Sequence, residues 1–366
     1  MAVGCRYRDL SPDIPRAGLV QVYRWNEPDG TWTEHGQALL GRSAQDQFGF
    51  SVALSKDGNK LAVSEVGLDR PGLDRAGNVR VFQWVSNLEV WTDMGQEISG
   101  EQIAELFGVS LALSQDGQRM AIGSPYHDDT DNRKILTGRV VLYEFDSDTS
   151  RWEKIGDLRG KASLDWFGWD VDMSPDGNRV VAGAPRNTVY GGFVQAFDYD
   201  GTSWTQVGNK MVNNYGTVKL DDRYGQAVSL DGDRVAVGSP WKDIGRNGNA
   251  GLVQVYELTM NPGNGTKEWI SLGEPLLGEA SFQQMGFSVD LKGDFLSVGS
   301  PGSTGDMSFH KWTDEVWDTV TAPLPNTGGA RSIGYAVAMS DDATVLVASS
   351  PSSGTRVYQR SDQDAI

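Results

Sequence analysis

The stretch FGWDVDMSPDGNRVVAGAP, residues 167–185, is one copy of a pattern that occurs six times in this chain of 366 residues. The other copies begin at Phe48, Phe107, Tyr224, Met285 and Ile333. Successive copies start 57 to 61 residues apart, apart from a last interval of 48 residues. A recurrence of this length predicts one supersecondary unit that stacks on copies of itself.

Each copy predicts four strands. The residues after the aromatic–glycine pair alternate between apolar and polar, and an Asp-Gly turn connects them to a second apolar strand. Asp-Gly between alternating segments is a strong hairpin signal, because glycine adopts the positive φ that such turns need. The turns are Asp57-Gly58, Asp116-Gly117, Asp176-Gly177 and Asp231-Gly232. A variable loop then leads to a third strand, as in 76–84, 137–145, 191–199 and 250–258.

The fourth strand of each copy opens with tryptophan and carries glycine four residues later. Glycine inside a strand marks a bulge or a close backbone approach, so this outer strand is expected to bend there. The pairs are Trp32/Gly36, Trp91/Gly95, Trp152/Gly156, Trp204/Gly208 and Trp269/Gly273, while Trp317 is followed by Thr321. Most tryptophans of the chain are therefore expected to be structural.

Many short strands at regular spacing, without a helical period, predict an all-β fold. A four-stranded unit of this length repeated around a ring is a β-propeller of antiparallel blades, and seven blades are predicted here. Six blades, with one blade shared by both ends of the chain, is the alternative. One propeller domain over 1–366 is expected, with repeat units at about 1–41, 48–100, 107–160, 167–213, 224–278, 285–326 and 333–360.

The first and last blades are predicted to be incomplete. Ala2-Val3-Gly4-Cys5 aligns with the AVGS of a later copy, so the N-terminal unit reads as strands two to four. The C-terminal unit reads as strands one to three. The missing strands favour a fragment of a longer repeat protein, in which Met1 would be an internal residue. Cys5 stands where later copies have serine, which predicts a small packed residue.

The segments Phe167-Gly168 and Gly183-Ala184-Pro185 resemble the motif of the FG-GAP repeat family, whose members include the propeller of integrin α chains. The pattern is closest to the FG-GAP-like repeats of large multi-repeat proteins of algae, diatoms among them, and of bacteria. This resemblance covers essentially the whole chain. It implies a propeller, and it favours the cell surface, the extracellular space or an organelle lumen for a protein whose compartment is otherwise unknown.

The calcium loop of integrin-type blades is not expected in this chain. Calcium takes about six to eight oxygen ligands from a loop long enough to surround it. The corresponding turn here is a short hairpin with one aspartate, as in residues 55–60. No metal site and no cofactor are therefore predicted.

Composition and charge exclude several classes of protein. One cysteine cannot form an intramolecular disulfide or a cysteine-based zinc site. No apolar run approaches the ~18 residues of a membrane helix. A net charge of −17 with only 32 Lys+Arg argues against a nucleic-acid partner. The three histidines, His35, His127 and His310, fall in different units, so no catalytic residues are predicted.

The loops between strands two and three are long and differ from copy to copy. Strand order places them on the side that propellers use for ligands. Exposed aromatic and arginine side chains supply much of the energy of binding, so these loops are a candidate recognition surface, with ordinary variable loops as the alternative. The candidate residues are Tyr7, Arg8, Arg70, Tyr126, His127, Asp128, Arg186, Trp241, Lys242 and Asp243.

A few other residues carry weaker signals. Trp166 and Trp169 fall outside the structural tryptophan pattern and are ligand candidates. His127 beside two aspartates is the one histidine whose neighbours could support a metal or acid–base role. Asn264-Gly265-Thr266 is a glycosylation sequon, which would be used only in a secretory compartment.

The favoured function is a non-enzymatic protein-binding or scaffold module within a larger surface, extracellular or assembly protein. The alternative is a lectin or a glycan-acting enzyme with its site on the loop side. Carboxylates gathered at the centre would favour an enzyme, separate aromatic pockets a lectin, and a flat surface of mixed charge a protein partner. A subunit built into a larger assembly is a third possibility.

Overall fold

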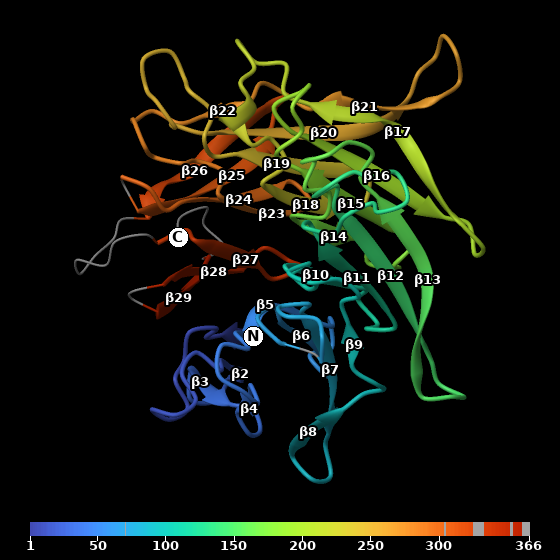
Figure 1. Cartoon of the computed structure of the whole chain (residues 1–366). Coiled ribbons are helices and arrows are strands. Elements are labelled where there is room, and N and C mark those ends of the chain that lie inside the picture. Colours follow the sequence, from blue (N-terminus) through green and yellow to red (C-terminus); the bar gives the residue numbers. More distant parts are fainter. Residues whose placement is uncertain (70, 304, 325–332, 352–353, 361–366) are drawn as a thin grey trace. The chain divides into compact units, whose positions relative to one another are not determined.

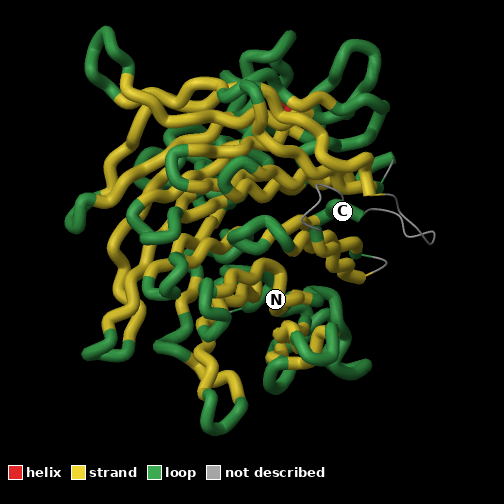
Figure 2. Tube along the Cα trace, turned by 180° about the vertical axis from the view of Figure 1, so that it is seen from behind, coloured by secondary structure: helices red, strands yellow, loops and turns green. Residues whose placement is uncertain are grey.

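The computed structural model describes the chain except for residues 70, 304, 325–332, 352–353 and 361–366 (Figure 1). Regular structure in the described residues is β-strand, apart from the 3-10 helix η1 (Leu220–Asp222) (Figure 2). These strands form seven sheets that follow one another along the sequence. The predicted all-β, seven-bladed propeller is confirmed, in preference to the six-bladed alternative.

The chain divides into two compact units. Unit 1 comprises residues 1–179 and 199–204, and unit 2 comprises residues 180–198 and 205–366. Sheets one to three lie in unit 1 and sheets five to seven in unit 2, while the fourth sheet contributes strands to both. The expectation of one domain over 1–366 stays a prediction.

Sheets two to six contain all four strands of the repeat, and consecutive strands lie side by side. In sheets two and five the fourth strand is broken into two pieces. Sheet two consists of β5 (Phe48–Leu54), β6 (Lys60–Glu65), β7 (Asn78–Val85), β8 (Val90–Asp93) and β9 (Ile98–Ser99). Sheet three consists of β10 (Ser110–Leu113), β11 (Arg119–Ser124), β12 (Arg139–Asp146) and β13 (Arg151–Arg159).

The next three sheets repeat this plan. Sheet four consists of β14 (Val171–Met173), β15 (Arg179–Ala184), β16 (Phe193–Tyr199) and β17 (Trp204–Val212). Sheet five consists of β18 (Ala227–Asp231), β19 (Arg234–Ser239), β20 (Leu252–Met260), β21 (Lys267–Ser271) and β22 (Leu276–Leu277). Sheet six consists of β23 (Ser288–Lys292), β24 (Phe295–Ser300), β25 (Asp306–Thr313) and β26 (Val316–Leu324).

The first and seventh sheets are shorter, as the repeat alignment predicts. The first sheet has strands two to four of the repeat: β1 (Ala2–Gly4), β2 (Leu19–Asn26), β3 (Thr31–Glu34) and β4 (Leu39–Leu40), the last two being pieces of strand four. The seventh sheet has, in the described residues, strands one to three: β27 (Ala336–Met339), β28 (Val345–Ser350) and β29 (Gly354–Gln359).

The glycines of the repeat motif form a contact between consecutive sheets. A Cβ atom on Gly183 would lie 2.0 Å from the carbonyl oxygen of Gly225, and one on Gly238 would lie 2.1 Å from that of Gly286. Since no side chain fits at such a distance, the two backbones can meet only at glycine. The glycine after the aromatic residue and the glycine before Ala-Pro or Ser-Pro are therefore two halves of one contact.

The tryptophan of strand four forms a second contact between sheets. A Cβ atom on Gly95 would lie 2.8 Å from the Trp152 ring, and one on Gly208 would lie 2.6 Å from the Trp269 ring. Both tryptophans are buried. The predicted bend is confirmed at Gly95, where strand four breaks between β8 and β9, and at Gly273, where it breaks between β21 and β22, whereas Gly208 lies within the continuous strand β17. The glycine makes room for the tryptophan of the following sheet.

Apolar side chains fill the space between consecutive sheets within each unit. In unit 1, Val20 of the first sheet packs in one cluster with Leu61 and Phe82 of the second. In unit 2, Val255 of the fifth sheet packs in one cluster with Leu296 of the sixth. Burial of both faces explains why strands two and three are apolar or small over most of their length.

Candidate binding surface at the loop end of the sheets

Each sheet has two chemically different ends. The strand order places the loop between strands two and three at the same end as the loop that enters the next sheet, and we call this the loop end. The other end carries the Asp-Gly hairpins and the turns between strands three and four, and we call it the hairpin end. The predicted recognition residues that the structure describes belong to the loop end.

In three of the Asp-Gly hairpins the aspartate, Asp57, Asp116 or Asp176, accepts hydrogen bonds from within its own hairpin. Asp57 Oδ1 accepts hydrogen bonds from Ser55 Oγ (2.6 Å) and from the backbone N–H of Asn59 (3.0 Å). Partial burial would raise the pKa of Asp57, but these hydrogen bonds outweigh burial and lower it. The carboxylate therefore holds a tight turn closed.

Two aspartates of the candidate surface close their own loops. Asp128 Oδ1 accepts a hydrogen bond from the backbone N–H of Leu136 (2.7 Å), and Asp243 Oδ1 accepts one from that of Asn249 (2.8 Å). The loops of the first two sheets contain the same contact, from Arg16 to Asp9 and from Arg75 to Asp69. Loops that look unrelated in sequence thus share one hydrogen bond from a backbone N–H to an aspartate, and Asp128 and Asp243 are two of these aspartates.

Two further candidates lie inside their loops. His127 is 3% exposed and Lys242 is 2% exposed. Lys242 Nζ donates hydrogen bonds to Asp222 Oδ2 (2.8 Å) and to the carbonyl oxygen of Thr217 (2.6 Å). These side chains stabilise the loop end from within and do not form part of its outer surface.

His127 belongs to a buried ionic network. Its Nδ1 lies 3.4 Å from Glu105 Oε2, and Arg139 Nη2 donates a hydrogen bond to Glu105 Oε1 (2.6 Å). Burial would raise the pKa of Glu105, but the hydrogen bond from His127 and the charge of Arg139 outweigh it and lower the pKa. Glu105 therefore stays ionised and paired, which suits a structural role.

The first exposed cluster lies in unit 1 and combines arginine with aromatic rings. The Arg6 guanidinium carbon lies 4.7 Å from the Tyr7 ring centroid and 4.5 Å from that of Phe50. The Arg16 guanidinium carbon lies 5.6 Å from the Tyr7 ring centroid. Tyr7 is 55% exposed. These contacts hold a large aromatic side chain in place while most of it faces solvent.

A second cluster of unit 1 is purely aromatic. Trp166 and Trp169 stack with their centroids 5.1 Å apart and their planes at 15°. Tyr126 packs edge-on against Trp166 at 5.1 Å. All three rings are half-buried. The structure therefore brings together one candidate loop residue and the two tryptophans that fell outside the structural pattern.

Unit 2 carries a similar cluster at its loop end. The Arg223 guanidinium carbon lies 4.2 Å from the Trp241 ring centroid. Trp241 packs against Phe287 at 5.9 Å, and Phe287 packs against Tyr335 at 4.8 Å. Tyr335 is 37% exposed. A cation and three aromatic rings thus form a continuous group.

Several of these residues were not predicted from the sequence. Phe50, Phe287 and Tyr335 each directly follow the glycine that opens a copy of the repeat, as Trp169 does, and this recurring large residue was the available signal. Of the other predicted residues, Arg8 is exposed and Arg186 is half-buried. Arg70 lies outside the described residues.

Other chemically relevant groups are placed as follows. In the described part of the chain, no three His, Cys, Asp or Glu side chains converge as metal ligands. The prediction that Cys5 is packed is wrong, since Cys5 is exposed. The first sheet lacks the strand and the loop that cover the corresponding serine in later sheets. The described residues also include no helix that is both long and apolar enough to cross a membrane.

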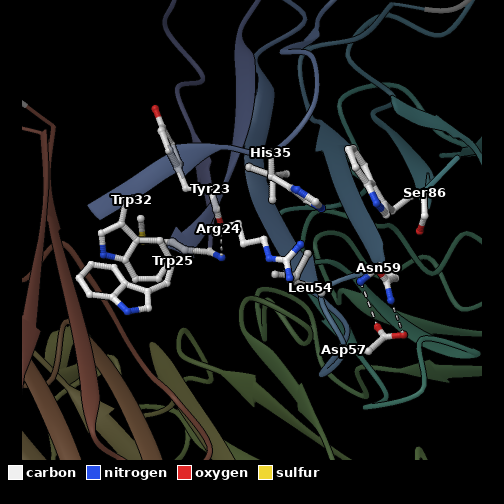
Figure 3. A pocket seen from close by; sticks show the side chains of 13 residues that line it. Tyr23, Arg24, Trp25, Trp32, His35, Leu54, Asp57, Asn59 and Ser86 are labelled. Atoms are coloured by element: carbon white, nitrogen blue, oxygen red, sulfur yellow. Dashed lines mark hydrogen bonds between the residues drawn. The ribbon is translucent and has the colours of Figure 1, made fainter. Parts of the chain in front are cut away.

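Unit 1 also contains a cavity of about 430 Å³ at the hairpin end (Figure 3). The hairpins of later sheets pack side by side, as when Lys56 N–H donates to the Gln115 carbonyl oxygen (2.9 Å). The first sheet has no such hairpin, which leaves room for the cavity. Its walls include Tyr23, Arg24, Trp25 and Trp32 from the first sheet and Asp57, Asn59 and Trp84 from the second.

Comparison with known families identifies the repeat. The model of the FG-GAP repeat matches residues 218–256, which include Tyr224-Gly225 and Gly238-Ser239-Pro240. This match to one repeat and the seven-sheet fold together support an FG-GAP-like β-propeller. No curated protein sequence matches the chain. The closer resemblance to algal and bacterial proteins stays a prediction.

Solved structures with the same fold have diverse roles. One is the periplasmic gluconolactonase PpgL of Pseudomonas aeruginosa, 15% identical over 99% of this chain and 92% of that chain, with a TM-score of 0.62. Another is a chain in the crystal structure of the Mitotic Checkpoint Complex, 15% identical over 99% of this chain and 91% of that chain, with a TM-score of 0.59. At this level of identity the likeness concerns the fold alone.

Proposed function

We propose that this propeller is a non-enzymatic protein-binding module and that its partner binds at the loop end. The observation that carries the proposal is the pair of clusters in which half-buried arginine and aromatic side chains stack beside an exposed tyrosine, Tyr7 or Tyr335. They are Arg6 with Tyr7 and Phe50 in unit 1, and Arg223 with Trp241, Phe287 and Tyr335 in unit 2.

Side chains of this kind suit protein recognition energetically. Trp, Tyr and Arg are the residue types that most often dominate the free energy of protein association. Stacking also restricts their rotamers before a partner arrives, which lowers the entropy lost on binding. In a chain of net charge −17, arginines beside aromatic rings favour a partner that presents carboxylates next to apolar groups.

The proposal is tested by capturing partners from the source organism on the immobilised chain. Tyr7→Ala and Trp241→Ala each remove an aromatic anchor at the loop end, and we expect each to reduce the captured partner at least about tenfold. Leu88→Ser is the control, because Leu88 is exposed in a turn at the hairpin end. A partner that all three variants capture as well as the unaltered chain contradicts the proposal.

A second candidate function is glycan binding at the aromatic cluster of unit 1. The nearly coplanar rings of Trp166 and Trp169 form a platform on which a sugar ring could stack. A glycan array with the unaltered chain and with Trp169→Ala separates the two functions. Strong array signals that Trp169→Ala abolishes, without a protein partner, would favour glycan binding.

We also propose that the module works as part of a larger surface, extracellular or assembly protein. The repeat fold supports this role, because a propeller presents unlike loops on a rigid framework without needing to change shape. Limited proteolysis of the protein from its source organism tests the idea. Recovery of a larger species that yields this chain as a protease-resistant core is the expected result, and a species of this size alone would contradict it.

A further inference from the structure

Four of the strand-four tryptophans make the same hydrogen bond to the preceding sheet, whereas the buried Trp204 Nε1 has no hydrogen-bond partner among the described residues. In these four cases the indole Nε1–H donates to the carbonyl oxygen of the residue before the bulge position. Trp91 donates to His35 (2.9 Å) and Trp152 to Met94 (2.9 Å) in unit 1. In unit 2, Trp269 donates to Val207 (3.1 Å) and Trp317 to Leu272 (3.2 Å).

An amide side chain just after the bulge glycine adds two more hydrogen bonds. Gln96 Nε2 donates to the carbonyl oxygen of Trp152 (2.8 Å), and its Oε1 accepts from the Trp152 backbone N–H (2.9 Å). Gln37 bonds Trp91 in the same way, and Asn209 bonds Trp269. Trp91, Trp152 and Trp269 therefore each recognise a segment with the sequence X–Gly–Gln or X–Gly–Asn, where X supplies a carbonyl, whereas the segment beside Trp317 is Leu272–Gly273–Glu274.

Glycine is required in such a segment for a steric reason. A Cβ atom at Gly95 or Gly208 would lie 2.8 or 2.6 Å from the ring of the following tryptophan. The residue before glycine varies, but in three of the four contacts it is apolar. The recognised segment is thus an extended strand with an apolar residue, glycine and a primary amide in sequence.

Trp32 is the strand-four tryptophan of the first sheet, and it is built like the others. Its ring packs on Trp25 with centroids 5.4 Å apart and planes at 58°, whereas Trp84 and Trp91 pack at 5.5 Å and 58°. In the described part of the chain, however, no X–Gly–Gln or X–Gly–Asn segment bonds the indole or backbone of Trp32. The ring stays half-exposed, while Trp91 is 3% exposed.

The rings of Trp25 and Trp32 are accessible from outside the first sheet. Both line the cavity at the hairpin end of unit 1, where Figure 3 shows them side by side. Trp32 pairs with Trp25 in the first sheet as Trp91 pairs with Trp84 in the second. The backbone N–H and carbonyl groups of Trp32 therefore hold the same position in their strand as those with which Trp91 bonds Gln37. The acceptor site is therefore preformed.

We propose that Trp32 is the docking site for an extended segment of a partner protein that carries an apolar–Gly–Gln or apolar–Gly–Asn sequence. The partner's carbonyl would accept the Trp32 indole proton, its glycine would lie against the ring, and its amide would bond the Trp32 backbone. This is recognition by strand addition, with specificity from the glycine and the amide. It is independent of the surface proposed above, because Trp32 begins strand four at the hairpin end.

A synthetic peptide of residues 90–99, VWTDMGQEIS, is the probe, because it contains the segment that Trp152 recognises. Labelled peptide is titrated with the intact chain and followed by fluorescence anisotropy. We expect saturable binding that weakens at least about tenfold when the peptide carries Gly95→Val, and about five- to tenfold when it carries Gln96→Ala. No binding, or equal binding of the Gly95→Val peptide, would overturn the proposal.

A variant of the chain locates the peptide. Trp32→Phe keeps an aromatic ring but removes the indole donor, and we expect it to weaken peptide binding about fivefold or more. Met260→Ser, at an exposed position of unit 2 outside both proposed surfaces, is the control and should leave peptide affinity unchanged. If Trp32→Phe binds the peptide as tightly as the unaltered chain, the peptide occupies another site and the proposal fails, whatever the outcome for the loop-end surface.

Discussion

Gly156 shows how a single residue can be fixed by its neighbour in the next sheet. A Cβ atom there would lie 2.6 Å from Trp204 Cδ1 and 3.2 Å from Leu142 Cδ2. Its backbone has no left-handed φ, so an L-residue could adopt the conformation. The reason for glycine at this position is therefore space and not backbone freedom.

We expect Gly156→Ala to destabilise the chain by about 1–3 kcal/mol, because the Trp204 ring must move to admit a methyl group. Urea denaturation followed by circular dichroism measures the change in the free energy of unfolding. Gly248→Ala is the control, since its Cβ would meet only Asp243 Oδ1 at 3.6 Å. Equal stability of the two variants would contradict the steric account.

His310 is a buried histidine whose protonation opposes folding. Its Nε2 lies 2.9 Å from Ser308 Oγ, and its Nδ1 lies 3.3 Å from Thr319 Oγ1. Burial lowers its pKa from 6.5 to about 4. Between these values the unfolded chain binds a proton that the folded chain does not, so the free energy of unfolding falls as the pH is lowered through this range.

We expect His310→Gln to remove this part of the pH dependence. The unaltered chain should lose up to about 3 kcal/mol of stability from His310 between neutral pH and about pH 4, and the variant should lack that loss. Denaturant titrations at a series of pH values compare the two slopes. Identical slopes would show that His310 titrates alike in the folded and unfolded states.

At the scale of elements, the amide after the bulge glycine connects strand four of one sheet to strand four of the next. We expect Gln96→Ala to cost about 1–3 kcal/mol, because it leaves the backbone N–H and carbonyl of Trp152 without their partner. Gln83→Ala, at an exposed position of β7, should change stability by less than about 0.5 kcal/mol.

Hydrogen exchange provides a second readout of the same contact. The backbone N–H of Trp152 donates to Gln96 Oε1, so its exchange should accelerate in Gln96→Ala and stay slow in Gln83→Ala. Unchanged protection of Trp152 in Gln96→Ala would mean that the amide does not hold the two strands together.

The strands and hairpins could be predicted from the sequence because their signals are local. Alternation, the Asp-Gly turn and the recurring tryptophan each act within one repeat. The loop end could be predicted only in part, because its side chains are sorted by contacts between distant segments. Glu105 pairs with His127 and with Arg139, and no local pattern reveals that this histidine turns inward.

At the scale of the whole molecule, the fold leaves the function open. Structures of this fold include a gluconolactonase and a chain of a checkpoint complex, so neither an enzyme nor a binding module follows from the architecture. The loop-end clusters of each unit support protein binding, because they carry arginine and aromatic side chains that the internal packing of the sheets does not require.

Oxidative footprinting of the complex with a captured partner shows whether that partner covers the loop end. Aromatic side chains that a partner covers become protected from hydroxyl radicals. We expect Tyr7, Trp241 and Tyr335 to lose at least about half of their reactivity, while Leu88 at the hairpin end keeps its own. Protection at the hairpin end, with the three loop-end side chains still reactive, would contradict binding at the loop end.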